Sequence, residues 1–197
     1  MRTYVRPVAM VCMVVLSGML LAGEAVKKEV VYDGDKIGET AKGWKAAEAP
    51  NKATVEAQDK VVRTAGKKTV EFHAEGQNWI GIGWNWFGWW PTDGGTDISN
   101  FKNVSFWAKV TGDKKPTQLS VALASNDKKA SQAADLLKYC PDLLDGKWHE
   151  VVVPIKDLDT KNELTKTKVW EIHFGTWSQD EIKFSLFVDE IGFDSRG

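Results

Sequence analysis

Tryptophan is the residue type in this sequence most suited to ligand chemistry, because ten Trp occur beside only three Tyr. Half of them fall within residues 79–90, where a hydrophobic core alone would favour Val, Ile and Leu. An indole ring offers a flat apolar face and one N–H donor. A sugar ring can stack its C–H face on such a surface while its hydroxyls bond to Asn, Glu or His. The cluster therefore predicts carbohydrate binding.

Side chains of a continuous strand alternate between two faces, which divides this cluster into core and ligand-binding candidates. Trp84 and Trp86 share a face with Ile80 and Ile82, and we expect them in the core. The other face carries Trp79, Asn85, Phe87 and Trp89, with Gly81 and Gly83 leaving a gap between them. Of these residues, Trp79, Asn85 and Trp89 are the ligand-binding candidates. A loop that covers Trp79 and Trp89 would instead make them part of the core.

The end of the cluster predicts a binding rim. Trp89 and Trp90 precede Pro91 and the turn signal of residues 93–95. Neighbouring strand residues point to opposite faces, so both indoles cannot enter one core. We therefore expect at least one of them to be solvent-accessible. An exposed Trp usually marks a binding surface.

Residues on other predicted strands complete the candidate site. Trp107 lies between Phe106 and Ala108, so its ring should emerge away from the core, unless a helix over residues 131–138 covers it. Trp177 is expected on the same face or at its rim. The last three candidates alternate with apolar neighbours and either hydrogen-bond a ligand on one outer sheet face or are simply exposed: His73, Glu171 and His173.

An enzymatic function is the least favoured alternative. Glycoside cleavage needs two carboxylates about 5–9.5 Å apart, and Glu71 and Glu171 are the only pair that we place on one sheet. The sequence has no Gly-x-Ser-x-Gly elbow, P-loop or dinucleotide fingerprint. Its histidines lack the close spacing of a zinc site, and Cys140 has no histidine nearby in sequence.

The elements that position these residues are mainly strands. Apolar and polar side chains alternate over six segments separated by turn signals: residues 69–75, 104–110, 118–123, 148–155, 169–174 and 184–191. Many short strands with one apolar face favour an all-β, two-sheet antiparallel sandwich, the jelly roll. Only residues 131–138 are expected to form a short helix, capped by Ser131.

The N-terminus predicts export. Arg2 and Arg6 precede an apolar run over residues 8–21 and then small residues, a pattern typical of a signal peptide, here residues 1–25. Residues 26–197 then form a single domain without a membrane span, secreted, periplasmic or at the cell surface. An uncleaved membrane anchor is the alternative. The 26 basic and 27 acidic residues form no basic block, which argues against nucleic-acid binding.

Four motifs resemble those of jelly-roll carbohydrate-binding modules of the galactose-binding-like superfamily. Residues 96–109 are similar to a D-I-S segment followed by F-W, and residues 145–155 to the strand G-x-W-x-x-V-x-I-P-L. Residues 184–193 resemble the closing strand, and residues 32–35 with Gly43-Trp44 fit the opening. Together the motifs cover nearly all of the mature chain in the right order. The Trp cluster is denser than the family pattern.

The resemblance also implies a structural calcium ion that joins the first strand to the last. The matching positions are Asp33 or Asp35 and Asp189. Calcium takes about six to eight oxygen ligands, and no Asp-x-Asp-x-Asp-Gly run supports the site independently. The alternative is that these acids are solvated turn residues and a hydrogen-bonded strand end.

We therefore expect a secreted, non-catalytic domain that binds an oligosaccharide or polysaccharide by stacking sugar rings on tryptophans. The first alternative is a structural or protein-interaction β-sandwich whose tryptophans pack against a partner. The second is a small polysaccharide-active enzyme. Neither the sugar nor the oligomeric state follows from the sequence.

Overall fold

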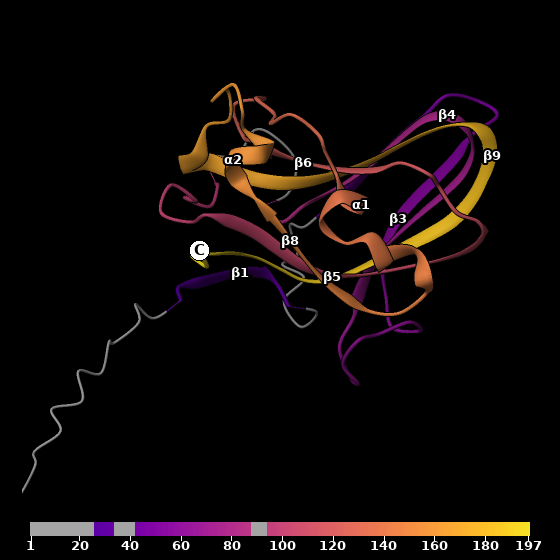
Figure 1. The fold of residues 1–197 in the computed structure, drawn as a ribbon, viewed down its shortest axis with the longest axis horizontal. Helices are drawn as coiled ribbons and strands as arrows, with labels where there is room; N and C mark the ends of the chain where they lie inside the picture. Colours follow the sequence, from indigo (N-terminus) through magenta and orange to yellow (C-terminus); the bar gives the residue numbers. More distant parts are fainter. Residues whose placement is uncertain (1–25, 34–41, 88–93) are drawn as a thin grey trace, which may run out of the picture.

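Strands dominate the fold, as the alternating pattern predicts. The computed structural model describes residues 26–33, 42–87 and 94–197, arranged as Figure 1 shows. The strands are β1 (Lys28–Tyr32), β2 (Lys42–Ala47), β3 (Lys52–Gln58), β4 (Thr69–Asn85), β5 (Asn103–Lys114), β6 (Leu119–Ser125), β7 (Ala134–Asp135), β8 (His149–Pro154) and β9 (Val169–Asp194). Short helical segments lie between them: α1 (Leu136–Tyr139), η1 (Pro141–Asp145), α2 (Ile155–Leu158) and η2 (Lys166–Lys168).

Two long strands belong to both layers of the sandwich. β4 and β9 pair antiparallel from Val70 opposite Val188 to Asn85 opposite Glu171. At one end they are flanked by β3 and β5, with β8 beyond β5, and we call this the β5 layer. At the other end they are flanked by β2 and β6, with β7 beyond β6, and we call this the β6 layer. β1 pairs with the end of β9.

A bulge in β4 marks the passage between the layers. The register shifts between Gly76 and Asn78, and both residues have positive φ, 142° and 61°. β3 pairs with β4 up to Glu75, whereas β2 pairs with it from Ile80. A bulge bends its strand, so it suits the point at which β4 changes its neighbours.

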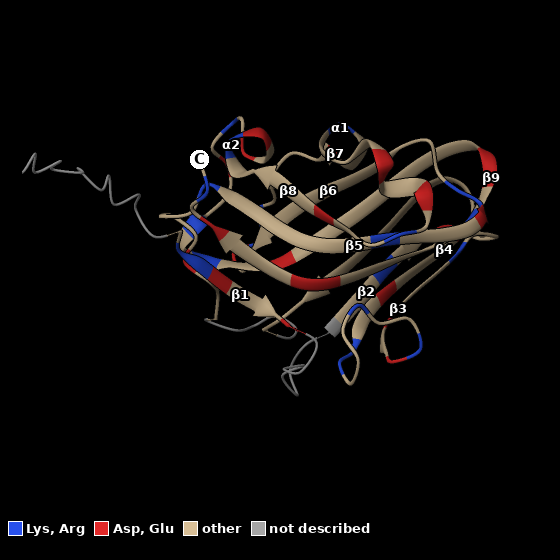
Figure 2. Ribbon diagram, turned by 60° about the horizontal axis from the view of Figure 1, so that its bottom comes forward, with Lys and Arg blue, Asp and Glu red and all other residues tan. Residues whose placement is uncertain are grey.

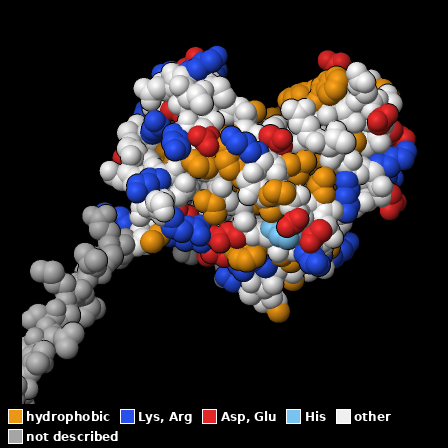
Figure 3. All heavy atoms as spheres, in the orientation of Figure 1, with side chains coloured by type: hydrophobic (Ala, Val, Ile, Leu, Met, Phe, Trp, Pro, Cys, Tyr) orange, Lys and Arg blue, Asp and Glu red, His pale blue; other side chains and the backbone are white. Residues whose placement is uncertain are grey.

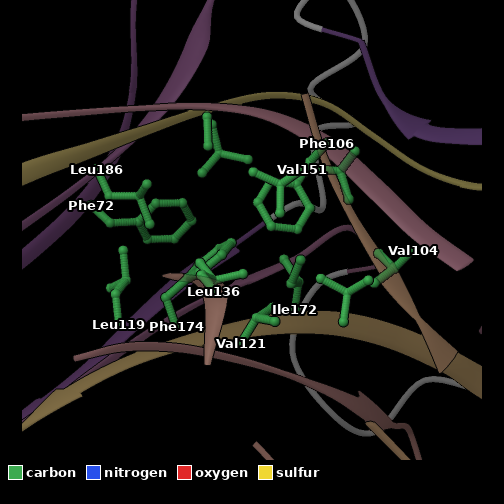
Figure 4. Packing of buried hydrophobic residues seen from close by; sticks show 14 of the residues in the cluster. Phe72, Val104, Phe106, Leu119, Val121, Leu136, Val151, Ile172, Phe174 and Leu186 are labelled. Atoms are coloured by element: carbon green, nitrogen blue, oxygen red, sulfur yellow. The ribbon is translucent and has the colours of Figure 1, made fainter. Parts of the chain in front are cut away.

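The core lies between the layers. Phe72 of the β5 layer and Phe174 of the β6 layer have ring centroids 4.9 Å apart, and Phe106 lies 5.6 Å from the same ring. Figure 4 shows these side chains meeting from opposite strands. Trp84 is 4% exposed and faces this core, and the half-buried Trp86 packs against it, which confirms the expectation for both.

The short helix begins later than the sequence predicts. α1 is a single turn capped by Asp135, whose carboxylate accepts a hydrogen bond from the Leu137 amide at 3.1 Å. The Ser131 hydroxyl instead accepts from the Leu123 amide at 2.9 Å. Leu136 is fully buried in the main core, as Figure 4 shows. The segment therefore closes this core and does not form a second one over Trp107.

The described residues show neither a concentration of charge of one sign nor a helix that could span a membrane. Acidic and basic residues are interspersed along the strands, without a block of one sign on the ribbon (Figure 2). No helix among these residues has the length and apolar character needed to cross a membrane.

Candidate carbohydrate-binding face

The outer face of the β6 layer gathers the exposed aromatic side chains. Trp79 of β4 lies directly opposite Trp177 of β9, and the two side chains are 52% and 46% exposed. Farther along the same face, Trp44 of β2 pairs with Gly83, which pairs with His173. Three indoles from three neighbouring strands therefore share one side of one layer.

The glycines of β4 make room for two of these rings. A Cβ atom at Gly83 would lie 2.3 Å from Nε1 of Trp44, and one at Gly81 would lie 2.4 Å from a ring carbon of Trp79. Both indoles therefore rest against bare backbone. The Trp44 and Trp79 rings themselves occupy the gap that the sequence predicts at the two glycines, so both rings lie close to the backbone of the sheet.

Glu171 organises the middle of this face. The residue is 6% exposed, and its carboxylate accepts hydrogen bonds from the Trp44 indole N–H and, at 3.3 Å, from the Asn85 amide. Nε2 of His173 contacts the same carboxylate oxygen as Trp44. The Trp44 and His173 rings meet edge to face with centroids 5.1 Å apart. Trp44 thus reaches from β2 across β4 to β9 and is held there.

These contacts change the roles expected for two residues. Asn85 is fully buried, and its side chain bonds to Glu171 and to the Phe87 amide, at 2.9 Å. Glu171 has both oxygens engaged by neighbours. Both residues support the aromatic side chains in this structure, whereas the sequence predicts direct ligand contacts for them.

The other candidates do not join this face. His73 and Trp107 lie on the outer side of the β5 layer, because Phe72 and Phe106 beside them point into the core. Nδ1 of His73 lies 3.0 Å from the Ser185 hydroxyl, and Arg63 stacks over the half-buried Trp107 ring at 4.9 Å. The expectation that one outer face unites these residues with His173 and Trp177 is therefore wrong. Trp89 and Trp90 lie outside the described residues.

The carboxylate pair considered for catalysis is also separated. Glu71 accepts a hydrogen bond from Ser185 at 2.7 Å on the outer side of the β5 layer, whereas Glu171 lies on the outer side of the β6 layer. The core stands between them, so they cannot flank one glycosidic bond.

The described part of the proposed calcium site holds cationic side chains. The Asp189 carboxylate is 1% exposed and accepts hydrogen bonds from Nε of Arg63 at 3.2 Å and from the Glu190 amide at 2.8 Å. Burial raises the pKa of this carboxyl, and the Arg63 guanidinium opposes that rise. Nζ of Lys67 donates to the Asp33 carbonyl at 3.2 Å. In this arrangement the Asp189 carboxylate is paired with a cationic side chain. Asp35 lies outside the described residues, and calcium binding stays a prediction.

The sequence alone did not single out Trp44 as a candidate residue of this face. Its strand has only six residues, too few for a clear period. The available signal was the pair of glycines in β4, since each lies beneath an indole.

Comparison with known families agrees with the architecture. Residues 29–195 match the family described as Carbohydrate binding domain 30. The chain belongs to this family. As a carbohydrate binding domain 30 member it has the β-sandwich that the sequence predicts, and the expected resemblance to carbohydrate-binding modules is confirmed. No curated protein matches the sequence.

Solved structures similar to this family 30 domain include two modules from Clostridium thermocellum. The family 30 module of the cellulosomal cellulase Cel9D-Cel44B is 15% identical, with a TM-score of 0.63 over 86% of this chain and 98% of that one. The family 11 module of Lic26A-Cel5E is 13% identical, with a TM-score of 0.56 over 86% and 95%. A β-1,2-glucanase from Parabacteroides distasonis is 16% identical, with a TM-score of 0.60 over 83% of this chain and 24% of the enzyme. At these identities the likeness shows the fold.

Proposed function

We propose that the mature domain is an exported, non-catalytic module that binds an oligosaccharide or polysaccharide on the outer face of the β6 layer. Sugar rings stack on Trp44, Trp79 and Trp177, while His173 offers its imidazole edge. Membership in a carbohydrate-binding family supports the ligand class. The signal-peptide pattern of residues 1–25 supports export.

The observation that carries the proposal is the Trp79–Trp177 pair. Two large apolar side chains stand side by side on adjacent strands with about half of each exposed. A soluble protein rarely leaves such a pair uncovered unless it binds something. Polar groups on the same face, the Ser120 hydroxyl opposite Gly175 and the His173 imidazole beside Trp44, suit an amphipathic ligand better than a purely apolar one.

Titration of the Trp fluorescence with soluble glycans tests the proposal. A family 11 module with a TM-score of 0.55 to this chain was solved with a β-1,3-1,4-linked tetrasaccharide, so mixed-linkage β-glucan is the first probe and a glycan array the second. We expect a saturable change that Trp79→Ala and Trp177→Ala weaken about tenfold each, since one ring contact contributes about 1–1.5 kcal/mol.

The control and the alternatives give different results. Trp107→Phe changes an aromatic side chain on the opposite outer face and should leave binding unchanged. Indifference to every glycan together with a concentration-dependent oligomer would favour the protein-interaction alternative. Release of reducing ends from a polysaccharide would favour the enzyme.

A further inference from the structure

A groove opens beside the Trp79–Trp177 pair, where β4 passes between the layers. Its volume is about 1030 Å³, and both indoles line it. The opposite wall is the end of β2 and the turn of residues 48–51, which leads into β3. Because both indoles belong to its lining, the groove is continuous with the aromatic face. Figure 3 shows hydrophobic side chains gathered at the upper edge of the molecule, over the ends of β4 and β9.

The wall of the groove is tied to β4 by the pairing of β2 and β3 and, at the turn, by the Asn51 side chain. Asn51 donates through its amide to the Gln77 carbonyl at 2.6 Å and accepts from the Gln77 amide at 2.9 Å. A Cβ atom at Gly76 would lie 2.0 Å from Oδ1 of the Asn51 side chain, so this close approach needs glycine. The bulge of β4 thereby fixes the turn at a set distance from the aromatic pair.

Three of the charged side chains that line the groove, Lys52, Glu75 and Glu181, are paired. Glu75 lies 3.2 Å from both Lys52 and Lys183, and the hydrogen bond from Lys52 is the first cause of its lowered pKa. Glu181 on the opposite side is paired with Lys114. Paired charges offer many hydrogen-bond donors and acceptors with little net field, which suits the hydroxyls of a neutral sugar and gives no advantage to a polyanion.

Asn78 is placed to read the ligand. It is exposed, lines the groove next to Trp79, and has a φ of 61° at the bulge. Bulges commonly redirect a side chain next to a binding site, and an amide presents both a donor and an acceptor to a hydroxyl.

From these observations we infer that the groove is a second part of the glycan site, which takes the continuation of a neutral saccharide chain beyond Trp79 and Trp177. This inference rests on the proposed function. The aromatic face supplies stacking, the groove supplies hydrogen bonds, and Asn51 is a positioning residue that holds the groove wall. Longer chains then bind more tightly than chains that cover only the aromatic face.

Calorimetric titration with oligosaccharides of increasing length tests the inference. The probes are cellotriose and cellohexaose, with a parallel series of mixed-linkage β-glucan oligosaccharides. Asn78→Gly removes the amide and tolerates the positive φ, and Asn51→Asp keeps the acceptor but loses the donor to Gln77. We expect each variant to weaken the hexasaccharide about tenfold while the trisaccharide affinity stays within about twofold. Thr54→Ala, exposed on the β5 layer, is the control.

The two proposals fail in different ways. The inference about the groove is overturned if the wild type binds short and long chains equally, or if the groove variants lose equal affinity for both lengths. The proposed aromatic site still stands in that case, provided that Trp44→Ala weakens binding of every glycan. Absence of wild-type binding to both series would overturn the proposed function itself and the groove with it. Melting curves identify a variant that is unfolded, and the other variant then decides.

Discussion

At the scale of single residues, the candidate face depends on a buried carboxylate. Glu171 accepts from Trp44 and Asn85 and contacts His173. Leaving a buried donor without its acceptor costs about 1–3 kcal/mol. The proposed stacking residue, Trp44, and the residue that orients it, Glu171, are therefore different residues.

This arrangement predicts that Glu171→Leu lowers both stability and glycan affinity. The indole N–H of Trp44 and the Asn85 amide lose their acceptor, so we expect a loss of about 1–3 kcal/mol in the free energy of unfolding and weaker binding. Glu171→Gln keeps one oxygen and should restore part of both. Denaturant unfolding and glycan titration measure the two effects. Wild-type values of both quantities in Glu171→Leu would contradict the role given to this residue.

Trp107 should behave in the opposite way to Trp79. Its ring is half-buried beneath Arg63, so Trp107→Ala should cost roughly 2 kcal/mol, below the ~3–5 kcal/mol of a fully buried aromatic residue. Glycan affinity should not change, because the ring lies on the other outer face. Trp79→Ala should weaken binding with little change in the melting temperature. A lower glycan affinity of Trp107→Ala, measured at a temperature where the variant is folded, would indicate that the ligand binds on the outer face of the β5 layer.

At the scale of elements, β4 uses glycine to seat the aromatic side chains. Gly83→Ala places a methyl group 2.3 Å from the Trp44 ring, so the ring must move and we expect about tenfold weaker glycan binding in a folded protein. Thr54→Ala, exposed on the β5 layer and away from this face, is the control. Similar affinities in the two variants, measured by fluorescence titration, would contradict this account.

Acid should loosen the junction between η1 and β8. The hydrogen bond from His149 lowers the pKa of Asp145 from 3.8 to about 2. A carboxyl whose pKa is lower in the folded state stabilises the fold above its unfolded value and loses this contribution as the pH falls toward 2. We expect the melting temperature to fall over this range and to fall less in Asp145→Asn. The comparison uses melts at pH values from about 5 to 2; parallel curves for both proteins would exclude this contribution.

At the scale of the whole molecule, an ion-pair network ties segments that are distant in sequence. Arg63 pairs with Asp189 at 3.2 Å, and Lys28 of β1 pairs with Glu190 at 2.6 Å. A guanidinium therefore occupies the surroundings of the carboxylate to which the family resemblance assigns calcium. A buried carboxylate that loses its partner is strongly destabilising.

Chelation separates the two possibilities. We expect Arg63→Met to lower the melting temperature, and a chelator to leave the melting temperature of the wild type unchanged in protein purified without added metal. A drop on chelation that calcium reverses would restore the calcium site, because a ligand that binds only the folded state adds stability. Asp33→Asn, measured in the same way, shows how much the Asp33 side chain contributes to the melting temperature independently of Arg63.

The sequence by itself determined the sandwich, the aromatic character of the candidate face and strand segments within β4, β5, β6, β8 and β9, whereas β1, β2 and β3 were not among the predicted segments. Alternation of apolar and polar side chains is a local property, so it is readable wherever a strand is long enough, as at Phe72 and Phe106. It also placed Trp84 in the core and Trp79 on the opposite side of its strand. The short helix near 131–138 was recognisable, but its start at Leu136 depends on the Asp135 cap.

Only the tertiary structure decided which outward-facing residues meet. His73 and His173 have the same alternating pattern, yet β4 and β9 each run through both layers and place the two histidines on opposite outer faces. Trp44 enters the site because its short strand pairs with Gly83. The alternation of apolar and polar residues predicts only that a side chain points away from the core. Strand pairing and the β4 bulge determine which of the two outer faces it joins.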